Sequence, residues 1–150
     1  MRTSPGIVLL LVSLAGCESR HIAARTAQDD AFPAAALAAY VDVQRALAAD
    51  DLDSARAALG RLRTSTSGPL GEQAGRAASG ADLDAVRREF KRLSADVVAR
   101  GIPEGYISVM CPMFDGGNAR WLQKRGQLAN PYFGRAMPMC GTIEKRPAGP

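Results

Sequence analysis

Histidine is almost absent from this chain of 150 residues, and that absence limits the chemistry of its fold. The single histidine, His21, lies in a polar segment before the predicted folded part, so no histidine is available there for a nucleophilic triad. Three cysteines are too few for a small domain held together by many disulfides. The Cys and His spacings that are typical of zinc sites are also missing. We therefore expect a protein that is not an enzyme.

Aromatic residues make up only 5% of the chain, and no apolar run reaches the length of about 20 residues that crosses a bilayer. The core must therefore be built mainly from Ala, Leu and Val. Of 27 alanines, 23 lie before residue 100 and 4 after it, which separates an Ala-rich, helix-prone part from a different C-terminal part. The length and composition exclude a multidomain enzyme and a polytopic membrane protein.

The N-terminal segment predicts an exported lipoprotein. Arg2 precedes an apolar run over residues 6–14, which is typical of an export signal. Residues 14–17, Leu-Ala-Gly-Cys, resemble the lipobox of bacterial lipoproteins, in which the cysteine thiol carries the lipid. We therefore predict a lipoprotein signal peptide over 1–16 and lipidation of Cys17. An ordinary cleaved signal followed by a chance cysteine is the alternative.

Lipidation at position 17 would place the mature chain in the periplasm, anchored to a membrane. Residues 17–33 are polar and aperiodic, as expected for a tether between the lipid and a domain. Glu18 follows the cysteine where an Asp would favour retention in the inner membrane, so we expect the outer membrane. Despite the formal net charge of +4, we expect the membrane and no nucleic acid as a partner, because the protein is exported.

Residues 34–101 predict a helical bundle. Apolar residues recur at helical spacing over 34–49 and again over 52–62, and the short break between them favours an antiparallel helical hairpin. Residues 64–80 are rich in Gly, Ser and Thr, and predict a loop with one short helix over 72–78.

A further helix has the strongest periodicity in the chain. Its apolar residues step by three and four positions: Leu83, Val86, Phe90, Leu93 and Val97. Asp82 is placed to cap its N-terminus, and Gly101 and Pro103 end it. The same helix carries a basic run: Arg87, Arg88, Lys91 and Arg92. We interpret this run as a solvated face, with contact to membrane headgroups as the alternative.

The C-terminal part, residues 102–146, concentrates sulfur. Four of the five methionines and two of the three cysteines form two clusters: Met110, Cys111 and Met113, then Met137, Met139 and Cys140. Alternation predicts a strand over 106–111, with 137–143 as a candidate partner strand. Pairing of these strands would bring Cys111 close to Cys140.

Together these patterns predict a mainly α fold of the α+β class. A three- to four-helix antiparallel bundle would carry a small C-terminal lobe resembling a β-hairpin, packed on it as part of the same domain. Residues 115–118, Asp-Gly-Gly-Asn, predict a turn and lack the Lys-Ser/Thr ending of a phosphate loop. We interpret the aromatic residues Trp121, Tyr132 and Phe133 as a small core of the lobe.

The C-terminal motif resembles a bacterial family. Its elements appear in order: Cys111-Pro112-Met113, Trp121-Leu122, Asn130-Pro131-Tyr132-Phe133-Gly134, Met137 and Cys140-Gly141. They are similar to an uncharacterised family of exported proteins and lipoproteins, which also occurs as a C-terminal domain on some periplasmic adaptors of Cus-type heavy-metal efflux pumps. The resemblance implies copper or another soft metal, and a heavy-metal efflux adaptor or other envelope protein as partner. Members often carry a His in the middle helical segment, where this chain has none.

Carried over position by position, the motif implies a metal site formed by Cys111, Met113, Met137 and Cys140, with Met110 and Met139 as possible extra ligands. Thiolate and thioether sulfur select Cu(I) over hard cations, so the sequence predicts Cu(I) binding for resistance or hand-over to an efflux system. A disulfide between the two cysteines is the competing prediction, since exported proteins form disulfides. In that case the protein would be a disulfide-stapled interaction module without metal.

Overall fold

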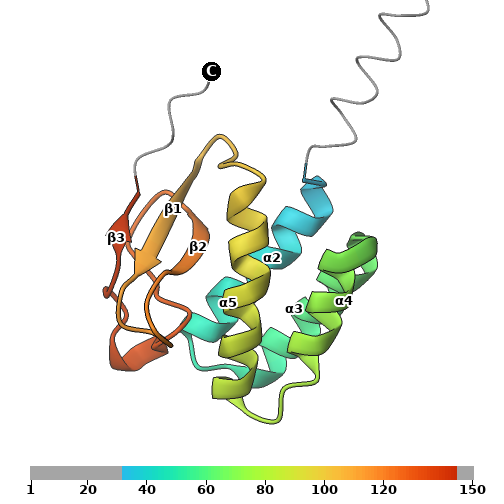
Figure 1. Cartoon of the computed structure of the whole chain (residues 1–150), viewed down its shortest axis with the longest axis horizontal. Coiled ribbons are helices and arrows are strands. Elements are labelled where there is room, and N and C mark those ends of the chain that lie inside the picture. The colour runs from blue at the N-terminus through green and yellow to red at the C-terminus, as the bar shows by residue number, and fades with distance from the viewer. Residues whose placement is uncertain (1–31, 145–150) are drawn as a thin grey trace, which may run out of the picture. The chain divides into compact units, whose positions relative to one another are not determined.

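The computed structural model describes residues 32–144, and these form one compact unit. The predicted signal peptide, Cys17 and all but the last two residues of the predicted tether lie outside the described residues. The elements in chain order are α2 (Ala34–Ala48), α3 (Leu52–Ser65), α4 (Gly68–Ala78), α5 (Leu83–Ala99), β1 (Tyr106–Cys111), β2 (Ala119–Lys124), the 3-10 helix η1 (Gly134–Ala136) and β3 (Thr142–Ile143). The mainly helical α+β fold is confirmed, with the small sheet lying beside α5 (Figure 1).

Aspartate side chains cap the N-termini of α3 and α5, and the second of these caps was predicted from the sequence. The Asp51 carboxylate accepts a hydrogen bond from the Ser54 amide at 3.0 Å, and the Asp82 carboxylate accepts one from the Ala85 amide at 2.8 Å. Among residues 32–144, no helix has the length and apolar character that a membrane crossing requires.

Helix α4 differs from the prediction of a loop with a short helix over 72–78, because it begins four residues earlier. Pro69 lies in its first turn, where a missing N–H group costs nothing. Three apolar residues at spacings of four and three then face the interior: Leu70, Ala74 and Ala77. The abundance of glycine concealed this stripe, and burial against the neighbouring helices outweighs the low helix propensity of glycine.

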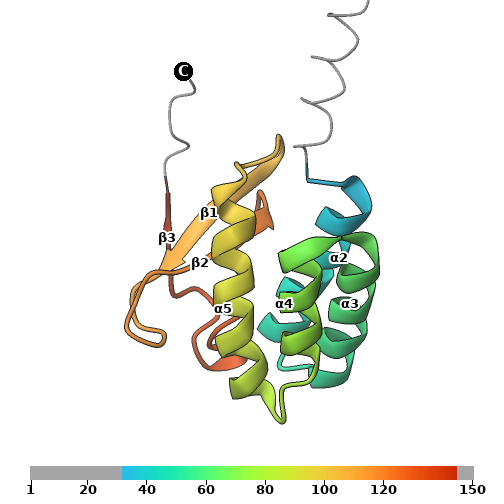
Figure 2. The same cartoon turned by 45° about the vertical axis from the view of Figure 1, so that its right-hand side comes forward.

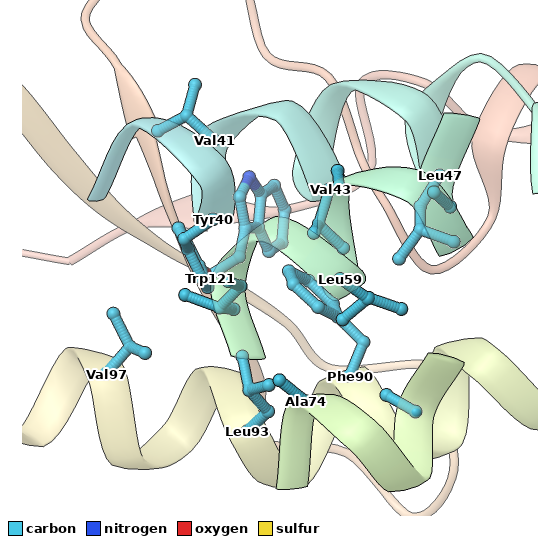
Figure 3. Packing of buried hydrophobic residues seen from close by; sticks show 14 of the residues in the cluster. Tyr40, Val41, Val43, Leu47, Leu59, Ala74, Phe90, Leu93, Val97 and Trp121 are labelled. Atoms are coloured by element: carbon cyan, nitrogen blue, oxygen red, sulfur yellow. The ribbon is translucent and has the colours of Figure 1, made fainter. Parts of the chain in front are cut away.

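The core runs from the bundle into the lobe without a break. The ring of Tyr40 on α2 stacks on Phe90 of α5 at 5.4 Å between centroids, and Phe90 lies 5.9 Å from Tyr132 of the lobe. Trp121 meets Tyr132 edge to face at 5.8 Å. Figure 3 shows Phe90 among residues of α2 and α3. The apolar stripe of α5 is therefore core from Val86 to Val97, as predicted, and so are Trp121 and Tyr132. Leu83 and Phe133 are half-buried.

The sheet is antiparallel, with strand order β2–β1–β3. Strand β1 has the predicted bounds, and residues 115–118 form the predicted turn, in which all four residues have positive φ. Strand β3 is only two residues long instead of the predicted seven. The strand is short because Pro138 has no N–H group to donate to a neighbouring strand. The Pro138 carbonyl accepts a hydrogen bond from the Asn130 amide at 2.9 Å, outside the sheet.

The basic run of α5 is not a uniform solvated face. Arg87 is only 7% exposed, so the interpretation of this residue as solvated is wrong. Its guanidinium donates to the carbonyls of Leu47 and Pro131, both at 2.9 Å, and to the carboxylate of Asp50 at 2.5 Å. The bond from Arg87 lowers the pKa of the Asp50 carboxyl. The Asp50 carboxylate also accepts a hydrogen bond from the Arg135 amide, so this pair joins the bundle to the lobe.

Candidate functional site

Three sulfur atoms meet at one end of the lobe. The Sγ atoms of Cys111 and Cys140 lie 3.6 Å apart, and the Sγ of Cys140 lies 3.9 Å from the Sδ of Met113. Both cysteines are free thiols. The predicted proximity of the two cysteines is therefore confirmed, although the partner strand is shorter than expected.

Strand β1 fixes the buried side of this sulfur cluster. Cys111 is the last residue of the strand and is fully buried opposite Ala119 of β2. Val109 lies two positions earlier and therefore on the same face as Cys111. The site thus combines a rigid strand end with the returning chain segment that brings Cys140.

Close packing at Gly141 lets that returning segment lie against the sheet. A Cβ atom at this position would lie 2.7 Å from the Trp121 ring and 2.7 Å from Val109 Cγ1, which is too close for any real side chain. Because Gly141 has no side chain, its backbone can approach the sheet, and the neighbouring Cys140 therefore lies close to β1.

A buried asparagine holds the backbone of the returning segment. The Asn130 side chain donates to the Cys140 carbonyl at 2.6 Å and accepts from the Tyr132 amide at 2.7 Å. Its own amide donates to Pro138, so one residue ties together both ends of this loop. Asn130 belongs to the C-terminal motif, but nothing in the sequence distinguishes this residue from its neighbours in the motif as the one that positions Cys140.

The loop that carries Met113 is held by an aromatic ring and an ion pair. Phe114 stacks on Tyr132 at 4.9 Å between ring centroids. Further along the loop, the Lys91 ammonium binds the carboxylate of Asp115 at 3.4 Å and also contacts the Asp115 carbonyl. These contacts hold both residues that follow Met113, while the methionine itself is 61% exposed.

Burial changes along the sulfur cluster from Cys111, which is fully buried, through Cys140 to the exposed Met113. Burial, together with the neighbouring Cys111 thiol, raises the pKa of the Cys140 thiol. At neutral pH this thiol keeps its proton, so any metal that binds it must displace the proton. Met113 gives the cluster a side that is open to solvent.

Among the described residues, the remaining methionines make no sulfur hydrogen bond to these three atoms. Met110 pairs with Arg120 and Thr142, and alternation along β1 turns its side chain to the face opposite Cys111. Met139 is exposed, and its sulfur accepts a hydrogen bond from Gln127 at 3.7 Å. Met137 is half-buried, and the described residues include no hydrogen bond between its sulfur and either thiol. The structure thus joins Cys111, Cys140 and Met113 of the six predicted residues.

Hard metal ions have no evident site in the described part of the chain. No group of three or more His, Cys, Asp or Glu side chains gathers there to hold a metal ion. A metal at the paired cysteines would therefore take further ligands from thioether sulfur, which soft ions accept.

Comparisons with protein-family models, curated proteins and solved structures found no match to this chain. The family resemblance drawn from the C-terminal motif therefore stays a prediction.

Proposed function

We propose that this protein binds one soft metal ion, Cu(I), through Cys111, Cys140 and Met113. The observation that carries the proposal is the spacing of the sulfurs, at 3.6 Å and 3.9 Å. With metal–sulfur bonds of about 2.3 Å, three ligands in a trigonal plane lie about 4 Å apart, and two ligands in a line lie about 4.6 Å apart. Both distances from the Cys140 sulfur are therefore close to the spacing of a three-coordinate site.

The chemistry of the ligands supports the choice of metal. Two thiolates and a thioether form a soft donor set, which favours Cu(I) over the hard cations of the envelope. Met113 is a neutral ligand on the solvent side, so we propose that the ion enters and leaves there. The sequence supports a setting for this transfer, namely a lipid-anchored protein of the periplasm that hands its ion to an efflux adaptor or another envelope protein.

A disulfide-stapled interaction module is the second candidate, and the separation of the thiols favours it. A disulfide has an S–S length of about 2.05 Å, so a closure of about 1.5 Å would join Cys111 to Cys140. Oxidation would remove both thiolate ligands. The two functions therefore predict opposite properties for the oxidised and the reduced protein.

Titration of Cu(I) against a chromophoric chelator tests the proposal. The full chain should carry Cys17→Ser so that the only thiols are Cys111 and Cys140. We expect one Cu(I) per reduced chain and none per oxidised chain. Met113→Leu should weaken binding by at least about tenfold, since even residues outside the ligand shell cost that much when replaced. Met139→Leu is the matched control, because the sulfur of this exposed methionine contacts Gln127 and, within residues 32–144, has no hydrogen bond to either thiol.

Two outcomes would contradict this assignment. Failure of the fully reduced chain to take up Cu(I) would refute the metal-binding function and favour the disulfide-stapled interaction module. An equal loss of affinity in Met113→Leu and Met139→Leu would refute the ligand role of Met113.

A further inference from the structure

A wide groove crosses the helical bundle away from the sulfur cluster. It has a volume of about 1010 Å³ and is lined by residues of α4, by the end of α3 and by one face of α5. Figure 2 shows α4 with α3 and α5 on either side. Gly71 and Gly75 of α4 are among the lining residues, and the absence of side chains there lets the end of α3 pack close to α4.

Helix geometry divides the basic run of α5 between two sides. Arg87 and Lys91 are four residues apart and contact the lobe, through Pro131 and Asp115 respectively. Arg88 and Arg92 are also four residues apart and line the groove instead.

Two further guanidinium groups come from other helices. Arg63 of α3 passes over α4, where a Cβ at Gly75 would lie 3.4 Å from its Cδ. Arg76 of α4 also lines the groove. Three helices therefore supply four arginines to one groove.

The lining has an excess of positive charge. Its four arginines face two carboxylates, those of Glu72 and Glu89, which leaves a formal charge of +2. Glu89 pairs with Arg92, and Glu72 lies 4.0 Å from Arg76. Within residues 32–144, the side chains of Arg63 and Arg88 have no hydrogen bond or ion pair. The guanidinium groups of Arg63 and Arg88, which come from the helices on either side of α4, can therefore donate all their hydrogen bonds to a ligand.

We propose that this groove binds a phosphate group that carries about two negative charges. The net charge of the lining matches such a dianion. A carboxylate has two oxygens in one plane, which suit a single guanidinium fork, whereas the tetrahedral oxygens of phosphate accept hydrogen bonds from several directions. Arginines that approach from three helices are therefore better suited to a phosphate than to a carboxylate. The phosphate belongs either to a soluble ester or to the headgroup of a lipid.

Binding by the full chain tests this proposal, with separate arms for the two sources. Inorganic phosphate, measured by calorimetry, represents the soluble source. Co-sedimentation with phosphatidic acid vesicles, against vesicles of phosphatidylcholine alone, represents the lipid source. The test variant is Arg63→Gln with Arg88→Gln. The matched control is Arg45→Gln with Arg100→Gln, which removes the same charge from exposed arginines outside the groove.

We expect the test variant to weaken binding of inorganic phosphate, of phosphatidic acid vesicles, or of both by at least about tenfold, because it removes two charged donors. The control should stay within about twofold of the wild type. The arm that responds identifies the source of the phosphate. No binding in either arm, an equal loss in the test and control variants, or equally tight binding of polyglutamate would overturn the proposal. Circular dichroism should show unchanged melting in the test variant, since both side chains lack partners.

Discussion

Replacement of Asn130 should loosen the returning segment without touching a sulfur atom. Asn130→Ala removes the donor to the Cys140 carbonyl and the acceptor for the Tyr132 amide. Each buried backbone group left unpaired costs about 1–3 kcal/mol, so the variant should lose about 3 kcal/mol of unfolding free energy. A domain of this kind has about 5–15 kcal/mol in total, so the variant should remain folded at 25 °C.

Asn130→Asp separates the two hydrogen bonds. The aspartate keeps an acceptor for the Tyr132 amide, but it turns a carboxylate oxygen toward the carbonyl of Cys140. Burial beside this carbonyl raises the pKa of the new carboxyl, and the protonated form regains a donor. Because the folded state then binds the proton more tightly than the unfolded state, stability falls as the pH rises above about 3.9. The deficit relative to the wild type should therefore be larger at pH 7 than at pH 4.5.

Urea denaturation of the reduced protein at both pH values measures this deficit, and Cu(I) titration measures its effect on the sulfur cluster. We expect both variants at Asn130 to weaken Cu(I) binding at neutral pH, since Cys140 loses its anchor. A destabilisation below about 0.5 kcal/mol for both variants would refute the positioning role of Asn130, because surface substitutions have effects of that size.

Three other changes test separate parts of the molecule. Cys17→Ser should move the exported protein from the membrane fraction to the soluble fraction, and a wild type that is wholly soluble after export would end the lipoprotein prediction. Phe90→Ala should cost about 3–5 kcal/mol in urea denaturation, because its fully buried ring contacts Tyr40 and Tyr132; a cost below about 1 kcal/mol would contradict that packing. The apparent Cu(I) affinity should rise from about pH 6 to about pH 9, because the raised pKa of Cys140 keeps a proton in competition with the metal, and a flat profile would exclude this thiol as a ligand.

Local patterns in the sequence were sufficient to predict α5, β1 and the proximity of the two cysteines. Strand β2 escaped prediction because its stability depends on distant residues. Its Leu122 amide donates to the hydroxyl of Tyr40 at 3.0 Å, which covers the edge of the sheet with a side chain from α2. Its Gln123 is buried and accepts hydrogen bonds from Trp121 and Ala129. The partners of Gln123 are local, but Tyr40 lies 82 residues from Leu122, so no window of neighbouring residues contains it.

The candidate site shows the same division between local and distant information. Alternation along β1 places Met110 and Cys111 on opposite faces of the strand. The sequence alone was therefore sufficient to exclude Met110 from a site that contains Cys111. The burial of Arg87 depends on partners 37 to 44 residues away along the chain, whereas the side-chain partners of Asn130 lie within the lobe, at most 10 residues away. Motif spacing predicts neither set of contacts, and the contact between Arg87 and Pro131 forms only when the lobe packs on the bundle.

The row of rings that links Tyr40, Phe90, Tyr132 and Phe114 has a consequence for modularity. Because the row begins in the first described helix and ends beside Met113, the lobe shares its interior with the bundle. A fusion that transplants only residues 102–146 would expose one side of this row and leave Arg87 behind. The smallest block that can be moved to another protein with its sulfurs in place is therefore the whole span from α2 to β3.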